Sequence, residues 1–374
     1  MTSLYPEVRD LSTLTGVFKT DSLLPVGVEG EMAATGTTAT LGTPETITTA
    51  EEAIAAFGVA SPLTLLVSFL LARGLPSVRA VASDDAAPNL AARQAAWATL
   101  AEDPTIRIRL TDSAVQADLV ALADSCEQAE LIQNKQFMFG ALASPNVKAT
   151  LTTAAAAIAS KRGILMGPGV YDSDGVLRSG AYAAAMAAVE VARNPDIVDS
   201  LNLAPLGATT GIEKDATGLP IFRLRVNGGS PVNDHADLLD DGVSTFIQGV
   251  DGRAAFSHLR MTYTTDDTYD ALMTLLIKDE TFLGIRDMLL AGKYHRRPNN
   301  ESTRNLAAAE TDNWLKAHND WVEPVELSNG DVGYGVTVTP SVDLKSFTVA
   351  YFGNVVRGTN VINVNGTLTI PVGQ

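Results

Sequence analysis

The chain has 374 residues, of which 46% are hydrophobic and 19% charged; this is the composition of a folded protein and excludes a mostly disordered chain. It carries 27 Lys and Arg against 43 Asp and Glu, a formal net charge of −16. Such acidity argues against sequence-independent binding of nucleic acid, which needs a surplus of basic residues. The single cysteine, Cys126, allows no intramolecular disulfide and no cysteine-based zinc site. Because it falls in an apolar helical pattern, we expect a buried, unreactive thiol.

The first 50 residues are poor in helix signals, so we expect an extended arm followed by short strands near 23–31 and 37–41. The start lacks the basic segment and apolar core of a secretory signal. The longest uncharged stretch, 53–72, has the length of a membrane span. Gly58 and Pro62 interrupt it, and this predicts two short buried helices, one ending near Phe57 and one starting at Pro62.

The segment from 51 to 196 alternates between strand and helix patterns. Arg107 and Arg109 alternate with apolar residues, which predicts a half-buried strand. A helix capped by Thr111 or Asp112 should follow, with an apolar stripe from Val115 to Ile132. We expect strands at 78–82, 105–110, 136–143 and 163–167, and further helices at 89–100, 146–160 and 179–193. Such alternation implies a sheet with helices on its faces.

The remainder of the chain is more mixed. Residues 197–262 are glycine-rich, with β-like pieces at 221–226 and 243–248, and helices are expected at 266–290 and 303–318. Residues 332–374 are β-like, with strands at 335–339, 346–351 and 360–370. The predicted fold class is therefore α/β (α+β): a mixed β-sheet core flanked by helices, with extended β-like N- and C-terminal arms. A terminal strand must pair with the chain's own sheet or with a neighbour's.

A search for catalytic and cofactor motifs identifies no phosphate loop, dinucleotide fingerprint or nucleophile elbow. Gly167-Pro168-Gly169 follows a strand but is interpreted as a plain turn. The segment from Asp172 to Gly175 resembles the start of a calcium loop, but Ala183 stands where the twelfth-position Glu would be needed. A surface Asx-turn is the expected structure there. We predict neither an enzyme nor a cofactor or metal site.

Two charge clusters stand out. The first surrounds His235 in a stretch without basic residues; a divalent metal site is conceivable there, but we favour a solvated acidic face or half of a salt bridge to a neighbouring subunit. The second is basic and spans 293–304. It is interpreted either as a complement to a helix dipole or as a docking site for an acidic protein. The carboxylates of the first cluster are Asp234, Asp237, Asp240 and Asp241.

Five short segments carry a family resemblance through their order along the chain. They are 43–53 (TPETITTAEEA) closing with AFG at 56–58, 179–187 (SGAYAAAMA), 202–206 (NLAPL), 239–246 (LDDGVSTF) and 260–265 (RMTYTT). In this order they resemble the sheath subunits of contractile bacteriophage tails, with Ser244 in the place of an Asn. The resemblance covers roughly residues 40–370.

The resemblance implies a structural subunit rather than an enzyme. Its copies would form six-fold rings stacked helically around the inner tail tube protein, and would meet baseplate and tail terminator proteins. Contraction would drive the tube through the host envelope, with the energy stored in the difference between two subunit arrangements. The expected location is the virion tail, assembled in the host cytoplasm, with no nucleic acid partner and no membrane insertion.

The resemblance also implies a domain organisation. It comprises an N-terminal arm (1–22), an α/β sheath domain (23–200), a C-terminal sheath domain (201–354) and a C-terminal arm (355–374). The arms would donate strands to neighbouring subunits, with residues 335–351 as the receiving hairpin. The expected inter-subunit arm residues are Leu4, Tyr5, Val8, Leu11, Val356, Val361, Val364, Leu368 and Ile370. The candidate tube contacts are Lys293, Arg296, Arg297 and Arg304.

Two other functions stay open at the level of sequence. One is a sheath subunit of a contractile injection machine that is not a phage tail. The other is an α/β ligand-binding or enzyme domain, whose site would lie at the carboxyl ends of the strands, for instance near 167–174.

Overall fold

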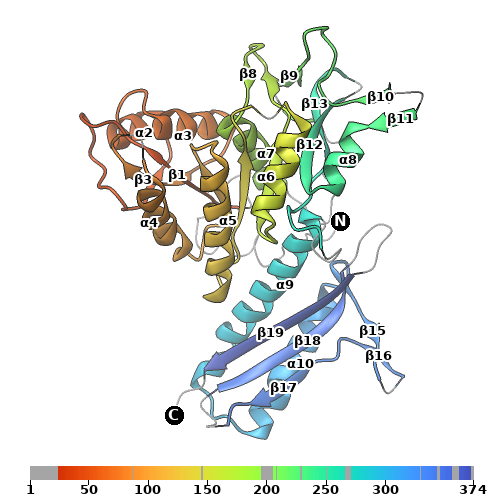
Figure 1. The fold of residues 1–374 in the computed structure, drawn as a ribbon. Coiled ribbons are helices and arrows are strands. Elements are labelled where there is room, and N and C mark those ends of the chain that lie inside the picture. The colour runs from red at the N-terminus through yellow and green to blue at the C-terminus, as the bar shows by residue number, and fades with distance from the viewer. Residues whose placement is uncertain are drawn as a thin grey trace. The chain divides into compact units, whose positions relative to one another are not determined.

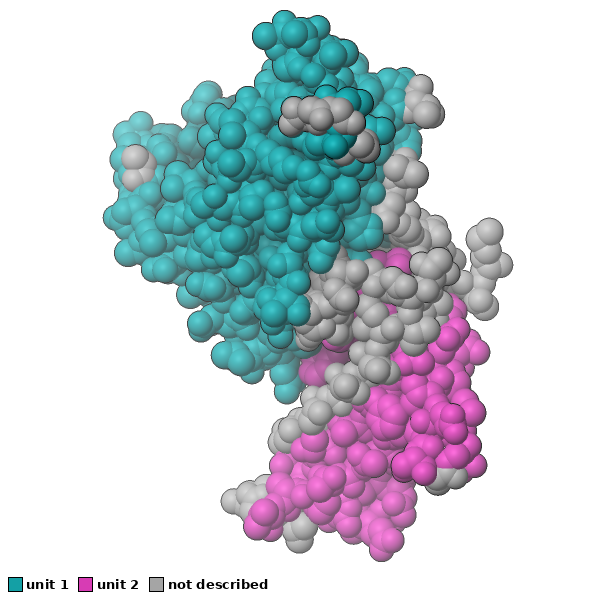
Figure 2. Space-filling model, turned by 45° about the vertical axis from the view of Figure 1, so that its right-hand side comes forward, with its two compact units in different colours: residues 1–195, 200–271 teal, residues 196–199, 272–374 magenta. Residues whose placement is uncertain are grey.

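The computed structural model describes residues 24–371, except residues 87, 145, 195–204, 208, 228–229, 250, 266–270, 329, 343–345 and 356–361. The described residues form two compact units, which Figure 2 colours separately. Unit 1 extends to Ala271 and unit 2 begins at Leu272. Strands from residues 243–258 still belong to the main sheet of unit 1, so the units divide at residue 271 and not near residue 200.

Unit 1 is built on an eight-stranded mixed sheet with the order β13-β12-β6-β5-β4-β1-β3-β2 (Figure 1). The strands from β12 to β3 in this order are parallel, and the edge strands β2 and β13 are antiparallel to their neighbours. Their bounds are β1 Val26–Glu31, β2 Glu45–Ile47, β3 Val78–Asp84, β4 Ile108–Thr111, β5 Phe137–Ala141, β6 Gly163–Gly167, β12 Val243–Gln248 and β13 Ala254–His258.

Helices cover both faces of this sheet, as the strand–helix alternation predicts. On one face α3 and α7 contact the strands, and on the other α4, α5 and α6 do. A parallel sheet needs both faces covered because its strands are apolar on both sides. The helices are α2 Ala50–Phe57, α3 Pro62–Ala72, α4 Leu90–Ala101, α5 Gln116–Leu131, α6 Lys148–Ile158, α7 Ala181–Arg193 and α8 Asp234–Asp240.

The uncharged stretch 53–72 forms two helices, as expected. Thr49 and Glu52 make a capping box at the start of α2, and Gly58 ends that helix with φ 86°. Ser61 caps α3, with Pro62 as its first residue. Among the described residues, no helix is both long and apolar enough to span a membrane.

Four local predictions are wrong. Neither Thr111 nor Asp112 caps α5, because the helix begins later, after Val115, which makes no side-chain capping bond. Strand β4 is buried on both faces, and Arg109 is 0% exposed, because β4 lies inside the parallel sheet under helices. The predicted apolar stripe of α5 is buried only at its centre; Val115 and Ile132 are 59% and 56% exposed because they lie just outside the helix. Residues 37–41 form no strand, and their backbone instead bonds to the carbonyls of Ala55 and Ala56 in α2.

Two smaller sheets complete unit 1. Strand β7 (Val170–Asp172) pairs with β8 (Leu177–Arg178) and with β9 (Thr209–Ile212). Strands β10 (Leu224–Asn227) and β11 (Ser230–Asn233) form an antiparallel hairpin that leads directly into α8.

Unit 2 packs two helices and a short 3-10 helix with an antiparallel sheet (Figure 1). Strand β18 is central, because β19 pairs along one of its edges while β17 and β14 share the other. Alternate residues of β18 are buried, as expected for a sheet with one face on a core. The elements are α9 Leu272–Ala291, η2 Tyr294–Arg296, α10 Glu301–Ala317, β14 Val322–Glu323, β15 Val325–Glu326, β16 Val332–Gly333, β17 Thr337–Pro340, β18 Ser346–Val355 and β19 Ile362–Pro371.

The described part of the chain thus confirms the predicted fold class, a mixed sheet core flanked by helices. Helix α9 starts at Leu272; the first residues of the helix predicted over 266–290 lie outside the described residues.

Candidate functional site

The carboxyl ends of β1, β3 and β4 are where an α/β protein would hold a ligand, because the strand order reverses there. A network of side chains fills this position. The carboxylate of Glu29 accepts hydrogen bonds from the Arg93 guanidinium at 2.8 and 3.0 Å, from Thr111 Oγ1 at 2.7 Å and from Trp97 Nε1 at 3.1 Å. Ser83 donates to the same carboxylate.

The electrostatics of this network centre on Arg93. Its guanidinium also contacts Asp112 at 2.6 Å and Asp118 at 3.3 Å, so one cation serves three carboxylates. The exposed fractions of the Arg93, Glu29 and Asp112 side chains are 8%, 0% and 7%. Burial raises the pKa of Glu29, and the charge of Arg93 opposes that rise. Because the carboxylate is surrounded by donors from its own chain, this strand end is packed as core.

The strand end at 167–174 is also occupied by the chain itself. The backbone N–H of Gly169 donates to the Glu213 carboxylate at 3.0 Å, and β7 begins directly afterwards. Asp172 Oδ1 accepts from the backbone N–H groups of Asp174 and Val176 at 3.0 and 2.9 Å. Burial disfavours its charge, but these bonds and Arg178 outweigh burial and lower the pKa of Asp172. The predicted Asx-turn is present, but Asp172 itself is buried, with 2% of the residue exposed, and not on the surface as expected.

The acidic cluster around His235 finds partners within the chain. Asp234 accepts from Arg225 at 3.0 and 3.1 Å, and Asp237 pairs with Lys148. His235 Nδ1 lies 3.0 Å from Thr245 Oγ1. Over the residues that the structure describes, no group of three or more His, Cys, Asp or Glu side chains is placed to hold a metal ion.

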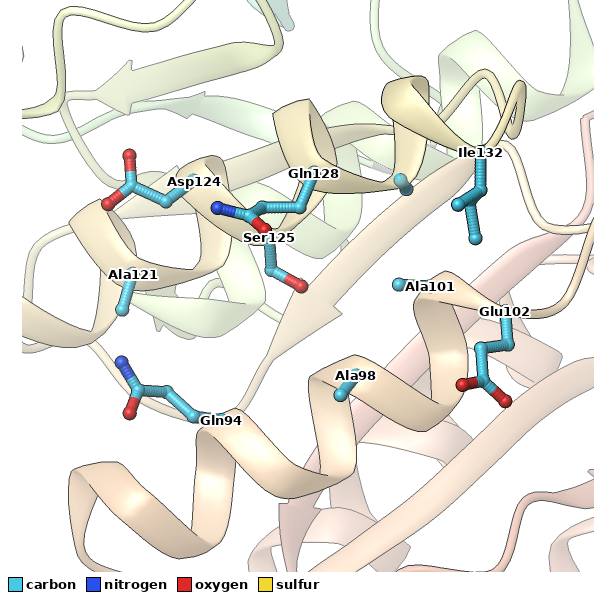
Figure 3. Close-up of a pocket in the computed structure, with 10 residues that line it drawn as sticks. Gln94, Ala98, Ala101, Glu102, Ala121, Asp124, Ser125, Gln128 and Ile132 are labelled. Carbon is cyan, nitrogen blue, oxygen red and sulfur yellow. The ribbon is translucent and has the colours of Figure 1, made fainter.

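A groove of about 470 Å³ runs between α4 and α5 (Figure 3). Short alanine side chains leave the space, and polar groups such as Asp124 and Gln128 project from α5 beside it. The residues that line the groove include no histidine, cysteine, lysine or arginine. The hydroxyl of Ser125, which is one of them, accepts a hydrogen bond from Arg109 Nη1 at 3.0 Å. Burial raises the pKa of Asp124, and the nearby negative charge of Glu127 raises it further by a smaller amount.

Of the basic residues predicted to contact a tube, Lys293, Arg296 and Arg297 lie between α9 and α10, and Arg304 lies in the first turn of α10. Lys293 and Arg296 are exposed, whereas Arg297 and Arg304 are half-buried. The Arg297 guanidinium lies 4.6 Å from the centre of the Tyr294 ring, and Arg304 donates to two oxygens of Asn299 at 3.2 and 3.0 Å.

This turn is fixed to the sheet of unit 2. The ring of Tyr294 is fully buried and meets Phe347 of β18 edge to face, with centroids 6.2 Å apart. Asn299 Nδ2 donates to the carbonyl of Ser346 at 2.7 Å. The basic turn is therefore held in place by β18, the central strand of the unit 2 sheet.

The predicted arm residues fall into two groups. Those in the first 22 residues, together with Val356 and Val361, lie outside the described residues. Val364, Leu368 and Ile370 lie in β19, which pairs with β18 of the same chain over ten residue pairs. Their role between subunits stays a prediction. Strands β17 and β18 form an antiparallel pair in the segment predicted to receive an arm; that role stays a prediction.

Comparisons by sequence find no relative: no protein-family model matches the chain, and no curated protein matches it.

Comparison of the fold with solved structures gives a consistent result. The sheath tail protein from Desulfitobacterium hafniense superposes with a TM-score of 0.66 at 13% identity, over 92% of this chain and 96% of that one. The sheath tail protein from Listeria innocua gives 0.67 at 10% identity, over 98% and 99%. The helical sheath of the anti-feeding prophage in its contracted state gives 0.61 at 12% identity, over 94% and 91%. The chain therefore has the fold of the sheath proteins of contractile tails, along almost its whole length.

Proposed function

We propose that the chain is a structural subunit of a contractile sheath, which polymerises with copies of itself around an inner tube. The observation that carries this proposal is the fold match to sheath tail proteins over 92% to 98% of the chain. The match includes both compact units, because a relation confined to unit 1 would cover far less of the chain. A protein that works by changing its packing against copies of itself needs no active site.

The finer description follows the sheath systems that share the fold. Copies would form six-fold rings stacked around the tube and attached to a baseplate and a terminator protein, and contraction would drive the tube through a host envelope. Placement in the virion tail of a phage belongs to this proposal. A second candidate is the sheath of an injection system that is not a phage tail, which the likeness to the anti-feeding prophage sheath favours.

Strand addition between copies is supported by the sheet of unit 2. Among the described strands, β19 pairs only with β18, so its outer edge can accept a further strand. We propose that residues 1–22 of a neighbouring copy supply that strand. β19 could also pair with β18 of a neighbour through the same backbone bonds, as in domain swapping.

The exposed pair Lys293 and Arg296 is the proposed contact with the tube. In a chain with a net charge of −16, an exposed basic turn is a local reversal that fits an acidic protein surface. Arg297 and Arg304 are partly engaged within unit 2, so we assign them to holding the shape of the turn.

The test is negative-stain electron microscopy of the purified chain over a concentration series, with and without the candidate tube protein. Hollow tubes or six-fold rings are expected. Uniform particles of the 39.3 kDa chain under both conditions would refute the sheath proposal.

Deletion of residues 1–22 tests the arm. It should leave a folded monomer that forms no long tubes, and tubes of normal length would refute the arm. Deleting 1–22 is preferred to deleting 355–374, because the second deletion would also remove β19 from the sheet that it forms with β18.

Charge reversal of Lys293 and Arg296 to Glu should weaken co-assembly with the tube protein. Lys316→Glu, at a lysine whose side chain is 62% exposed on α10, is the matched control.

A further inference from the structure

The basic turn between α9 and α10 contains a strained residue. Lys293 has φ 58°, in the left-handed region, which is unfavourable for a residue with a Cβ atom. The N–H groups of Lys293, Arg296 and Arg297 donate to carbonyls three residues back along the chain. These local bonds close the turn, but a strained residue persists only where the surrounding structure holds it in place. The contacts between the turn and the rest of unit 2 therefore decide its shape.

Two side chains attach the turn to the sheet of unit 2. The ring of Tyr294 is 0% exposed and meets Phe347 edge to face. It also lies over Gly292, where an added Cβ atom would be 2.7 Å from the ring. Asn299 Nδ2 donates to the carbonyl of Ser346 at 2.7 Å. The turn is thus attached to the first two residues of β18.

The same end of β18 is covered along one edge by β19. Ser346 pairs with Pro371, and Phe347 pairs with Ile370. Strand β19 also contacts η2 and α9, and Figure 1 shows it lying along β18. Because Tyr294 is the first residue of η2, the turn lies against two neighbouring strands. Loss of β19 would open the site in which Tyr294 is buried.

We propose that Tyr294 and Asn299 are positioning residues, which make the tube contact of Lys293 and Arg296 depend on a strand in the β19 position. The inference rests on the proposed function, because it concerns the proposed tube contact. The strand can be the copy's own β19 or the same strand of a neighbour. When the position is empty, the site of Tyr294 is open and the strained turn relaxes.

This coupling sets an order for assembly. A copy whose β19 has moved to a neighbour binds the tube only after the strand of another copy replaces it. Coupling between two binding events is reciprocal, so a tube that binds the held turn also stabilises the strand on β18. Copies joined through their strands therefore bind the tube more tightly than copies with an empty β19 position.

Trypsin digestion of the purified chain tests the turn without any tube protein. The enzyme cleaves after basic residues, and the turn exposes Lys293 and Arg296. The double variant Thr367→Pro, Leu368→Pro should detach β19, because successive N–H groups point to opposite edges of a strand and one of the two must face β18. Cleavage at the turn should then be about tenfold faster, whereas cleavage after the exposed Arg253 of unit 1 should not change.

A strand supplied in trans separates positioning from a general loss of structure. A synthetic peptide of residues 360–373, added to the double-proline variant, should restore slow cleavage at the turn. A peptide of the same composition in scrambled order is the control. Equal cleavage of the turn in the unmodified chain and the double-proline variant, or no slowing by the peptide, would overturn the proposal.

A second variant displaces Tyr294 while it keeps β19 and the charge of the turn. Gly292→Ala adds a methyl group 2.7 Å from the ring, whereas Gly333→Ala in β16, the matched control, adds one 3.3 Å from its nearest neighbour. Gly292→Ala should weaken co-assembly with the tube protein about tenfold. Gly333→Ala should not, and the conservative Tyr294→Phe, which keeps the ring, should co-assemble like the unmodified chain.

The outcomes separate this coupling from the proposed function. If the unmodified chain binds no tube protein, the tube contact is refuted, and the digestion shows separately whether β19 positions the turn. If the chain binds tube protein and Gly292→Ala binds it as well as Gly333→Ala does, only the coupling is refuted. Should the double-proline variant also lose the fold of unit 1, the comparison of these two alanine variants decides the matter.

Discussion

Arg93 should be the most sensitive single position in unit 1. Its guanidinium contacts Glu29 at 2.8 Å and Asp112 at 2.6 Å, and all three side chains are at most 8% exposed. Arg93→Met keeps most of the side-chain volume but leaves the carboxylates of Glu29, Asp112 and Asp118 without their cation. Breaking a buried pair by removing one partner costs about 3–5 kcal/mol in the free energy of unfolding. With a urea m-value of about 3 kcal/mol per M, the unfolding midpoint should fall by about 1–1.7 M.

The pH dependence of that loss follows from Glu29. Burial already raises the pKa of Glu29, and Arg93 opposes the rise, so the substitution should raise this pKa further. An acid whose pKa is higher in the folded state than in the unfolded state stabilises the fold at low pH, and this contribution disappears as the pH rises through the folded pKa. The deficit of Arg93→Met relative to the unmodified chain should therefore be larger at pH 8 than at pH 5.5.

The assay is urea unfolding followed by circular dichroism at both pH values. Arg253→Met is the matched control, because Arg253 pairs with Asp251 at 2.6 Å with side-chain exposures of 45% and 39%. An exposed pair contributes about 0–1 kcal/mol. An Arg93→Met variant as stable as Arg253→Met, or one with the same deficit at both pH values, would show that the network does not hold unit 1 together.

Three further results are expected. Burial raises the pKa of the fully buried Cys126 thiol, so a thiol reagent should label it in 6 M urea and not in the folded chain; rapid labelling of the native protein would contradict its burial. Gly284→Ala would place a methyl group 2.3 Å from the Trp314 ring. This overpacking should lower the free energy of unfolding by about 1–3 kcal/mol and shift the tryptophan emission. An unchanged melting temperature would exclude tight packing between α9 and α10. Burial disfavours the charge of Glu130, but the interaction with Arg162 outweighs burial and lowers the pKa of Glu130 to about 2. The unmodified chain should therefore be more stable than Glu130→Gln above pH 4.5, and this difference should vanish as the pH falls towards 2. A difference that persists at pH 2 would refute the lowered pKa.

Several features could be predicted from the sequence because they depend on near neighbours in the chain. The break between α2 and α3 follows from Gly58 and Pro62, and the capping Thr49 and Ser61 act within a few residues of their own positions. The strand–helix alternation of unit 1 and the alternating burial of β18 likewise reflect local periodicity. These local patterns were sufficient for the fold class.

Other features depend on residues far apart in the sequence. Glu29 and Arg93 are 64 positions apart, and Thr111 joins the same network from 82 positions away. The local sequence indicated this network only through Glu29, a charged residue within the otherwise apolar strand β1. Arg109 was misplaced for the same reason, since burial of both faces of β4 depends on helices that lie elsewhere in the chain.

The local pattern predicted many of the helices and strands of this chain, and the order of weak motifs along it indicated a sheath subunit. Only the tertiary structure decided which strands are neighbours and that β19 pairs with β18. The physical reason is that propensity and capping act over a few residues, whereas strand order and burial are set by contacts that the sequence does not encode locally.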